Sequence, residues 1–188
     1  MQNIQYTIKD INLSLMQRLT LQTRMITYVV VLVLVELIVI GGESARLLAN
    51  QQEKQLSLRA LAVANSVAAM PSFISHVEKQ QDSEELHKLI ERVRNSAGAE
   101  FIVIGDKQGI RLTHPVKENI GKSMVGGDND RALHGGESYI SRATGSLGPS
   151  LRAKVPVINS KHEIIGIVSV GYLEQTITQK ARPLLLKI

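Results

Sequence analysis

Two cations at alternate positions are the residues of this 188-residue chain best suited to hold a small anion. Arg152 and Lys154 lie in the segment 145–156, which reads GSLGPSLRAKVP and opens with small residues whose backbone can approach a ligand closely. Side chains two apart on a β-strand point to the same side, so a strand here places both cations on one face. Arginine can hold a carboxylate through two parallel hydrogen bonds, and lysine adds a point charge. The pattern favours a ligand with several carboxylates, with two solvent-exposed cations as the alternative.

A second group of donors lies upstream, in Arg111-Leu-Thr-His114. Histidine donates from one ring nitrogen when neutral and from both when protonated. If Arg111, His114, Arg152 and Lys154 met in one cavity, they would repel one another when it was empty, and a multiply charged anion would relieve that repulsion. We therefore expect binding to be coupled to closure of the loops at 115–127 and 143–149.

The elements that must position these residues follow from hydrophobic periodicity and turn residues. Strands are predicted at 101–105, 110–114, 138–142, 150–158 and 164–172, and the last is nearly all apolar and should be central. Asp128 is expected to cap a short helix that continues through Leu133. A long helix at 43–69, ended by Pro71, and shorter helices at 72–79 and 84–95 precede the strands, with Asp82 or Ser83 capping the last helix. The predicted fold class is α+β, with a five-stranded antiparallel sheet and a long N-terminal helix.

The segment 25–42 is apolar enough to cross a membrane. It has twelve Ile, Leu or Val residues between Ile26 and Ile40 and a single charge, Glu36. About 18 residues are near the lower limit for a span, and no small-residue cleavage site follows, as a signal peptide would require. Lys9, Arg18 and Arg24 precede it, so residues 1–24 are expected in the cytoplasm and residues 43–180 outside. Residues 181–188 resemble the start of a second transmembrane helix, cut off.

Composition excludes several functions. With no cysteine there are no disulfides, no cysteine-ligated metal and no thiol catalysis. The net charge of +5 is interleaved with acids and forms no Lys/Arg block, so a nucleic-acid partner is not expected. Histidines lack zinc spacing, and the serines lack evident His–Asp partners. We expect no metal, no cofactor and no catalytic residues in this chain.

Four motifs in order, RLTHP, IGKSMVGGDND, GSLGPSLRAKVP and GIVSVGYL, resemble the periplasmic sensor domain of citrate-sensing histidine kinases and the related C4-dicarboxylate sensors. The resemblance covers roughly residues 60–173. It implies a PAS-like fold, also called PDC or Cache, that binds a tricarboxylate between sheet and loops. It also implies a membrane-bound homodimer, joined through the helix at 43–69, in which a histidine protein kinase, absent from this chain, passes the signal to a response regulator.

The same resemblance implies which residues touch the ligand. The set comprises four cationic or potentially cationic side chains, a loop offering backbone N–H groups, one hydroxyl and one closing residue: Arg111, His114, Arg152 and Lys154; Gly145, Ser146 and Leu147; Ser169; and Met124. One position departs from the pattern, because Val103 stands where the citrate sensor has a threonine hydroxyl. Lys154 adds a third cation to Arg111 and Arg152, and this favours citrate with its three carboxylates. A C4-dicarboxylate sensor for malate, fumarate or succinate is the alternative, as is a chemoreceptor-type sensor or dimerisation module without a kinase.

Overall fold

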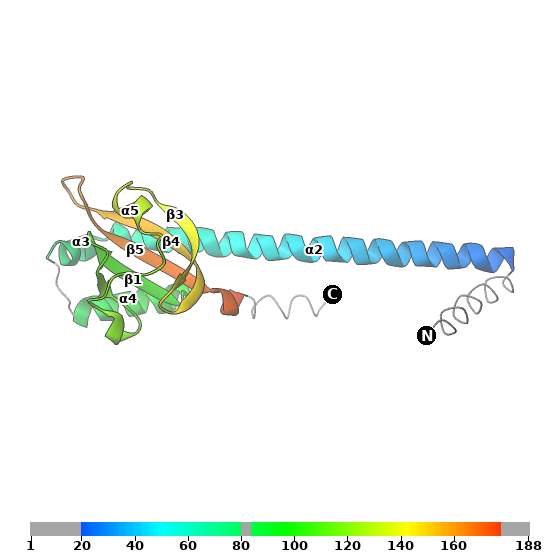
Figure 1. The fold of residues 1–188 in the computed structure, drawn as a ribbon, viewed down its shortest axis with the longest axis horizontal. Coiled ribbons are helices and arrows are strands. Elements are labelled where there is room, and N and C mark those ends of the chain that lie inside the picture. Colours follow the sequence, from blue (N-terminus) through cyan, green and yellow to red (C-terminus); the bar gives the residue numbers. More distant parts are fainter. Residues whose placement is uncertain (1–19, 80–83, 178–188) are drawn as a thin grey trace, which may run out of the picture. The chain divides into compact units, whose positions relative to one another are not determined.

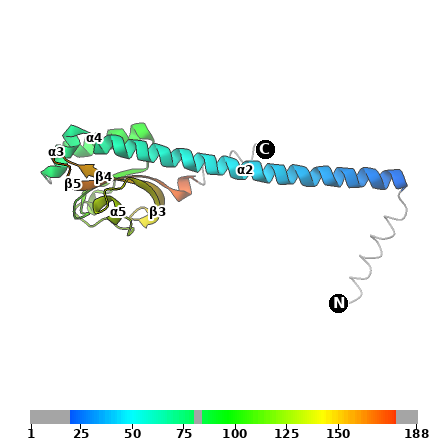
Figure 2. The same ribbon diagram turned by 90° about the horizontal axis from the view of Figure 1, so that it is seen from above.

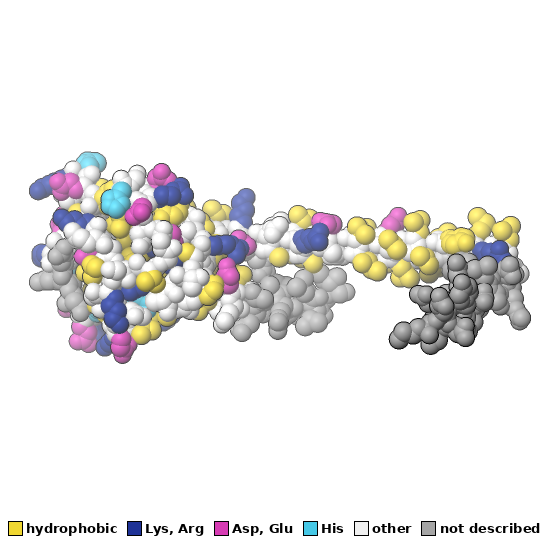
Figure 3. All heavy atoms as spheres, viewed as in Figure 1, with side chains coloured by type: hydrophobic (Ala, Val, Ile, Leu, Met, Phe, Trp, Pro, Cys, Tyr) yellow, Lys and Arg dark blue, Asp and Glu magenta, His cyan; other side chains and the backbone are white. Residues whose placement is uncertain are grey.

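A computed structural model describes residues 20–79 and 84–177, in two compact units, residues 1–48 and 49–188. The helix α2 (Leu21–Ala68) belongs to both, so the predicted membrane helix and the long helix after it are one continuous element (Figure 1). In the first unit, apolar side chains of α2 face outward, yellow along the helix in Figure 3. By length and composition α2 could cross a membrane, and no part of its most apolar 18-residue stretch is buried.

Two shorter helices complete the helical part of the second unit. After α2 ends at Ala68, α3 (Pro71–Glu78) has its proline at the first helical position, where the missing N–H costs no hydrogen bond. The next helix, α4 (Glu84–Ala97), is followed by Gly98 in the left-handed conformation that ends many helices. The cap predicted at Asp82 or Ser83 lies outside the described residues.

The strands form one antiparallel sheet, in the order β2-β1-β5-β4-β3. Their bounds are β1 Phe101–Asp106, β2 Arg111–Thr113, β3 Tyr139–Gly145, β4 Gly148–Ile158 and β5 Ile164–Leu173. Between β2 and β3 lie a 3₁₀ turn, η1 (Lys117–Asn119), and a short helix, α5 (Asp130–Leu133). The predicted five-stranded antiparallel sheet with the last strand at its centre is confirmed.

The two faces of the sheet have different roles. One face carries Ile102, Ile104, Val168 and Val170, which pack with the helices in the hydrophobic core. Figure 2 shows α3, α4 and the end of α2 on this side and α5 on the other. From α2 the core takes mainly the small side chains Ala60, Ala64 and Val67, with Leu56 and Leu61 partly buried, whereas Leu58 is exposed. Alanines let the helix lie close to the sheet. The opposite face is left for the site.

Two local predictions need correction. Residues 143–149 are not a long loop, because β3 and β4 pair as far as Gly145 and Gly148 and leave a two-residue turn. Asp128 does not cap α5, whose N-cap is Asn129 with no side-chain cap bond, because the Asp128 carboxylate is bound by sheet residues. After β5 a helical turn covers residues 174–177. The predicted second span at 181–188 lies outside the described residues.

Candidate functional site

A cavity lies on the sheet face opposite the core. It encloses about 340 Å³ of empty space, part of which is open to solvent. Eight of the nine predicted site residues are among those that line it, the exception being Lys154. The lining comprises Phe101, Val103, Arg111, His114, Met124, Val125, Gly145, Ser146, Leu147, Gly148, Ser150, Arg152 and Ser169.

The floor of the cavity follows from strand register. Val103, Ser169 and Lys154 lie directly opposite one another on β1, β5 and β4, so they form one row on this face. The next row holds Phe101, Gly171 and Arg152. A Cβ at position 171 would collide with the Phe101 ring. The glycine therefore leaves room for this ring beside β5.

Arg152 is buried, with 4% of its surface exposed, and is held by one edge of its guanidinium. Its Nε donates to Asp128 Oδ2 over 2.8 Å. The other edge lies between two glycines: a Cβ on Gly126 would collide with Nη2, and one on Gly145 would come within 2.9 Å of Nη1. The Nη2 atom is buried and has no hydrogen-bond partner. Arg152 thus lines the cavity and has one buried donor without a partner.

Arg111 reaches the same cavity from the edge strand β2. The strands that carry Arg111 and Arg152 are not neighbours, because β1 and β5 lie between β2 and β4. Arg111 is 5% exposed, and its burial lowers the pKa of the guanidinium from its ordinary value. No ion pair to Arg111 is found among the described residues. A buried guanidinium without a counter-charge favours a bound anion.

His114 connects the end of β2 to the turn of the β3–β4 hairpin. Its Nε2 lies 2.8 Å from Ser146 Oγ, and the Val116 N–H donates to Nδ1 over 2.9 Å. Nδ1 also lies 3.0 Å from Val116 O, so Nε2–H donates to Ser146 Oγ in the neutral tautomer whose Nδ1 accepts from the Val116 N–H. Burial, and then the charge of Arg111, lower the pKa of His114, while the backbone of Val116 opposes them. The lowered pKa favours the neutral ring, and the negative charge of a bound anion would favour its protonation.

Met124 closes the cavity beside the floor. Its backbone N–H donates to Gly109 O over 2.8 Å, which fixes the segment against the β1–β2 turn. Its sulfur packs so closely on Gly105 that a Cβ there would lie 2.7 Å away. Ser146 and Leu147 form the two-residue turn that bounds the cavity elsewhere. Met124, Ser146 and Leu147 therefore line the same cavity.

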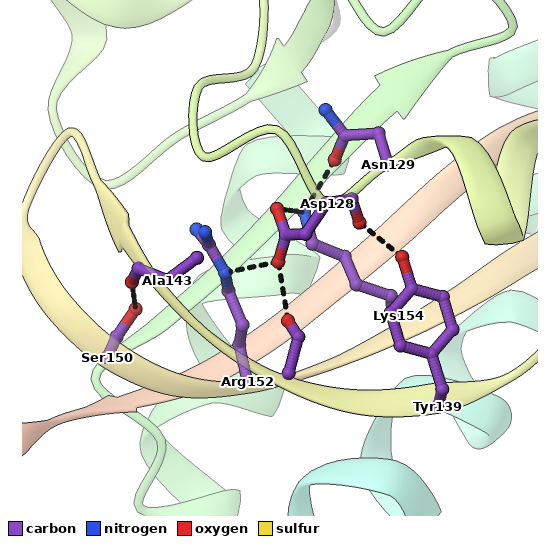
Figure 4. A network of polar contacts seen from close by, with 8 residues as sticks. Asp128, Asn129, Tyr139, Ala143, Ser150, Arg152 and Lys154 are labelled. Carbon is purple, nitrogen blue, oxygen red and sulfur yellow. Dashed lines mark hydrogen bonds and ion pairs between the residues drawn. The ribbon is translucent and has the colours of Figure 1, made fainter.

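Lys154 points to the side of the cavity and is completely buried. Its Nζ donates to Asn129 Oδ1 over 2.7 Å and lies 3.7 Å from Asp128 Oδ1. Desolvation lowers the pKa of Lys154 to about 8, although the charge of Asp128 opposes that shift. Figure 4 shows Asp128 between Arg152 and Lys154, with Asn129 beside the lysine.

Sequence reasoning missed this network around Asp128. Ser141 Oγ donates to Asp128 Oδ2 over 2.5 Å, and Tyr139 donates its hydroxyl to the Asp128 carbonyl. These two residues lie opposite Arg152 and Lys154 across the β3–β4 pair. The available signal in the sequence was spacing. Tyr139 and Ser141 are two residues apart, as are Arg152 and Lys154, so each pair shares one face of its strand.

Three comparisons place the chain among known proteins. Residues 47–185 match the family described as single cache domain 3. Sensor protein CitS of Halalkalibacterium halodurans is 44% identical over 161 residues, which are 86% of this chain and 30% of that protein. Sensor histidine kinase CitA of Klebsiella pneumoniae is 45% identical over 118 residues, which are 63% of this chain and 21% of that protein. The chain thus spans less than a third of the length of these relatives.

A solved structure supports the same placement. The crystal structure of the Escherichia coli DcuS sensor domain superposes with a TM-score of 0.66 at 30% identity, over 70% of this chain and 98% of that one. The long helix followed by a five-stranded antiparallel sheet is therefore the Cache fold.

Proposed function

This chain is a member of the single cache domain 3 family, and on that basis we propose that it is the ligand-sensing region of a membrane sensor histidine kinase that binds citrate or a related di- or tricarboxylate. The ligand-binding residues of the proposal are the nine predicted from sequence. Citrate is favoured because Lys154 is a third cation beside Arg111 and Arg152, and it could bind a third carboxylate.

The observation that carries the proposal is an excess of buried positive charge around one cavity. Arg111, Arg152 and Lys154 are each at most 5% exposed. Within the described part of the chain, Asp128 is the one carboxylate paired with Arg152 and Lys154. The Nη2 of Arg152 and the hydroxyl of Ser169 are buried without hydrogen-bond partners, and both residues line the cavity. Buried polar groups are nearly always paired, so unused donors around a cavity favour an anionic ligand.

A C4-dicarboxylate is the second candidate, and two observations favour it. Val103 lies beside Ser169 in the same row of the sheet and presents an apolar side chain to the cavity. A hydroxyl at this position could have bound another ligand oxygen. Lys154 is engaged by Asp128 and Asn129 and does not line the cavity. With Lys154 so held, the two arginines match two carboxylates.

The rest of the proposal concerns the whole protein. Its bounds are a cytoplasmic segment at 1–24, a membrane helix at 25–42 within α2, an extracytoplasmic sensor at 43–180 and the start of a second span at 181–188. Ligand closure would act on β5 and so on the chain that leaves it. A homodimer through 43–69, a kinase and a response regulator complete the scheme, and the relatives named sensor histidine kinases support it.

Thermal unfolding of the full chain in detergent, with and without citrate, isocitrate, malate or succinate, tests the proposal. A ligand that binds only the folded state stabilises it by about 2.7 kcal/mol at a hundred times its Kd. We expect citrate to raise the melting temperature in a concentration-dependent way, and Arg111→Ala to abolish that rise while the chain stays folded. No rise with any of the four acids would contradict the proposal.

A further inference from the structure

We propose that Asp128 is a specificity-determining residue, which competes with a ligand carboxylate for Lys154 and so sets the preference between tricarboxylates and dicarboxylates. The inference rests on the proposed function. Asp128 itself does not line the cavity, so its effect on the ligand passes through the two cations that it holds.

Asp128 holds the two cations beside the cavity through its carboxylate. Its Oδ2 accepts from Arg152 Nε over 2.8 Å and from Ser141 Oγ over 2.5 Å, while its Oδ1 lies 3.7 Å from Lys154 Nζ. Only 13% of its side chain is exposed. Its Oδ1 is buried and accepts no hydrogen bond. The Asp128–Lys154 pair is thus longer and less complete than the Asp128–Arg152 pair, and is the easier of the two to exchange.

Lys154 lies next to residues that line the cavity but does not line the cavity itself. Its register partner on β5 is Ser169, which lines the cavity, and Arg152, two residues before it on the same face, lines it too. The lysine instead directs its Nζ to Asn129 Oδ1 at 2.7 Å, on the side of Asp128 (Figure 4). A flexible four-carbon side chain allows the ammonium group to turn toward either side.

The two ligand classes therefore make different demands on Asp128. With Asp128 charged, the cavity presents Arg111 and Arg152, enough for two carboxylates. A third carboxylate must draw Lys154 away from Asp128 and Asn129. Neutralising Asp128 removes one competitor for the lysine, so it should favour a tricarboxylate more than a dicarboxylate.

Asp128→Asn is the informative variant because it keeps the shape. The amide oxygen can still accept from Arg152 Nε, and Tyr139 binds the backbone carbonyl of residue 128 rather than its side chain. Asp130→Asn is the matched control. It removes a charge two residues away whose side chain is 90% exposed and pairs only with His134 at 3.6 Å among the described contacts.

The experiment is calorimetric titration of the full chain in detergent with citrate and with succinate. We expect Asp128→Asn to raise the ratio of citrate affinity to succinate affinity about tenfold, equivalent to ~1.4 kcal/mol, and Asp130→Asn to leave it unchanged. Lys154→Met should lower the ratio, and adding Asp128→Asn to Lys154→Met should then have no effect on it. A structural role alone would weaken both ligands equally and leave the ratio constant.

Three results would overturn the inference: an unchanged ratio in Asp128→Asn, the same rise in the absence of Lys154, or the same rise in Asp130→Asn. If Asp128→Asn does not fold, Asn129→Ala, which removes the hydrogen bond to Lys154, must raise the ratio in the same direction or the inference is wrong. A wild-type chain that binds neither acid contradicts the proposed function itself. A wild-type chain that binds, with an unresponsive ratio, contradicts only the role of Asp128.

Discussion

Arg111 and Arg152 line one cavity although their strands, β2 and β4, are three positions apart in the sheet. Neighbouring strands are about 4.8 Å apart, so the two backbones are separated by roughly 14 Å. Long arginine side chains leaning inward from both sides leave β1 and β5 as a floor between them. This arrangement supports the proposal of a short ligand with a carboxylate at each end.

The first prediction concerns the glycine against Arg152. A methyl group at position 126 would collide with Nη2, so Gly126→Ala should displace the guanidinium and weaken citrate binding at least about tenfold, as loss of a charged hydrogen bond does. Gly127→Ala is the control, because residue 127 also has a positive φ but no atom within 4 Å of the added Cβ. Titration of both variants checks it, and equal affinities would contradict it.

The second prediction separates affinity from stability at Ser169. Its hydroxyl is buried without a partner in the empty cavity. Removing an unpaired polar group costs the folded state nothing, whereas a ligand loses a donor worth ~1 kcal/mol. Ser169→Ala should therefore bind citrate about fivefold more weakly without lowering the melting temperature of the ligand-free chain. Citrate titration and thermal unfolding of wild type and Ser169→Ala measure the two effects. A lower melting temperature with unchanged citrate affinity would contradict the prediction.

The third prediction follows from the lowered pKa of Lys154, about 8, caused mainly by desolvation. Between about pH 8 and pH 10.5 the unfolded chain keeps a proton on this lysine that the folded chain has released. The unfolding free energy attributable to Lys154 must therefore rise with pH through that window and stay constant below it. Denaturant unfolding of wild type and Lys154→Met at pH 7, 8, 9 and 10 checks the sign. The unfolding free energy of the wild type should rise relative to that of the variant as pH rises. A difference independent of pH would refute it.

Much of the fold could be predicted because it depends on local pattern. The apolar run of β5, the turn residues between strands and Pro71 each determine a short element without reference to the rest of the chain. The helix contacts were harder to predict. Leu58 is exposed, while the smaller Ala60 and Ala64 are buried, so the buried side of α2 does not follow from hydrophobicity alone.

The site could be predicted only in part, for a similar reason. Arg152 and Lys154 were placed on one face by alternation, and this is confirmed by their register with Gly171 and Ser169. Asp128 was assigned to a helix cap, the common local use of an aspartate in that position. Its contacts with Ser141 and Arg152 join residues 13 and 24 positions apart in the chain, and no local pattern encodes them.

The most direct test of the account is calorimetric titration of the full wild-type chain with citrate at pH 7, beside Arg152→Ala. The account predicts saturable binding of one citrate per chain, and a loss of about 2–5 kcal/mol of binding free energy when Arg152 is truncated, because one partner of a buried charge pair is removed. Near-wild-type affinity in Arg152→Ala, or no heat from citrate, isocitrate, malate or succinate with the wild type, would contradict it.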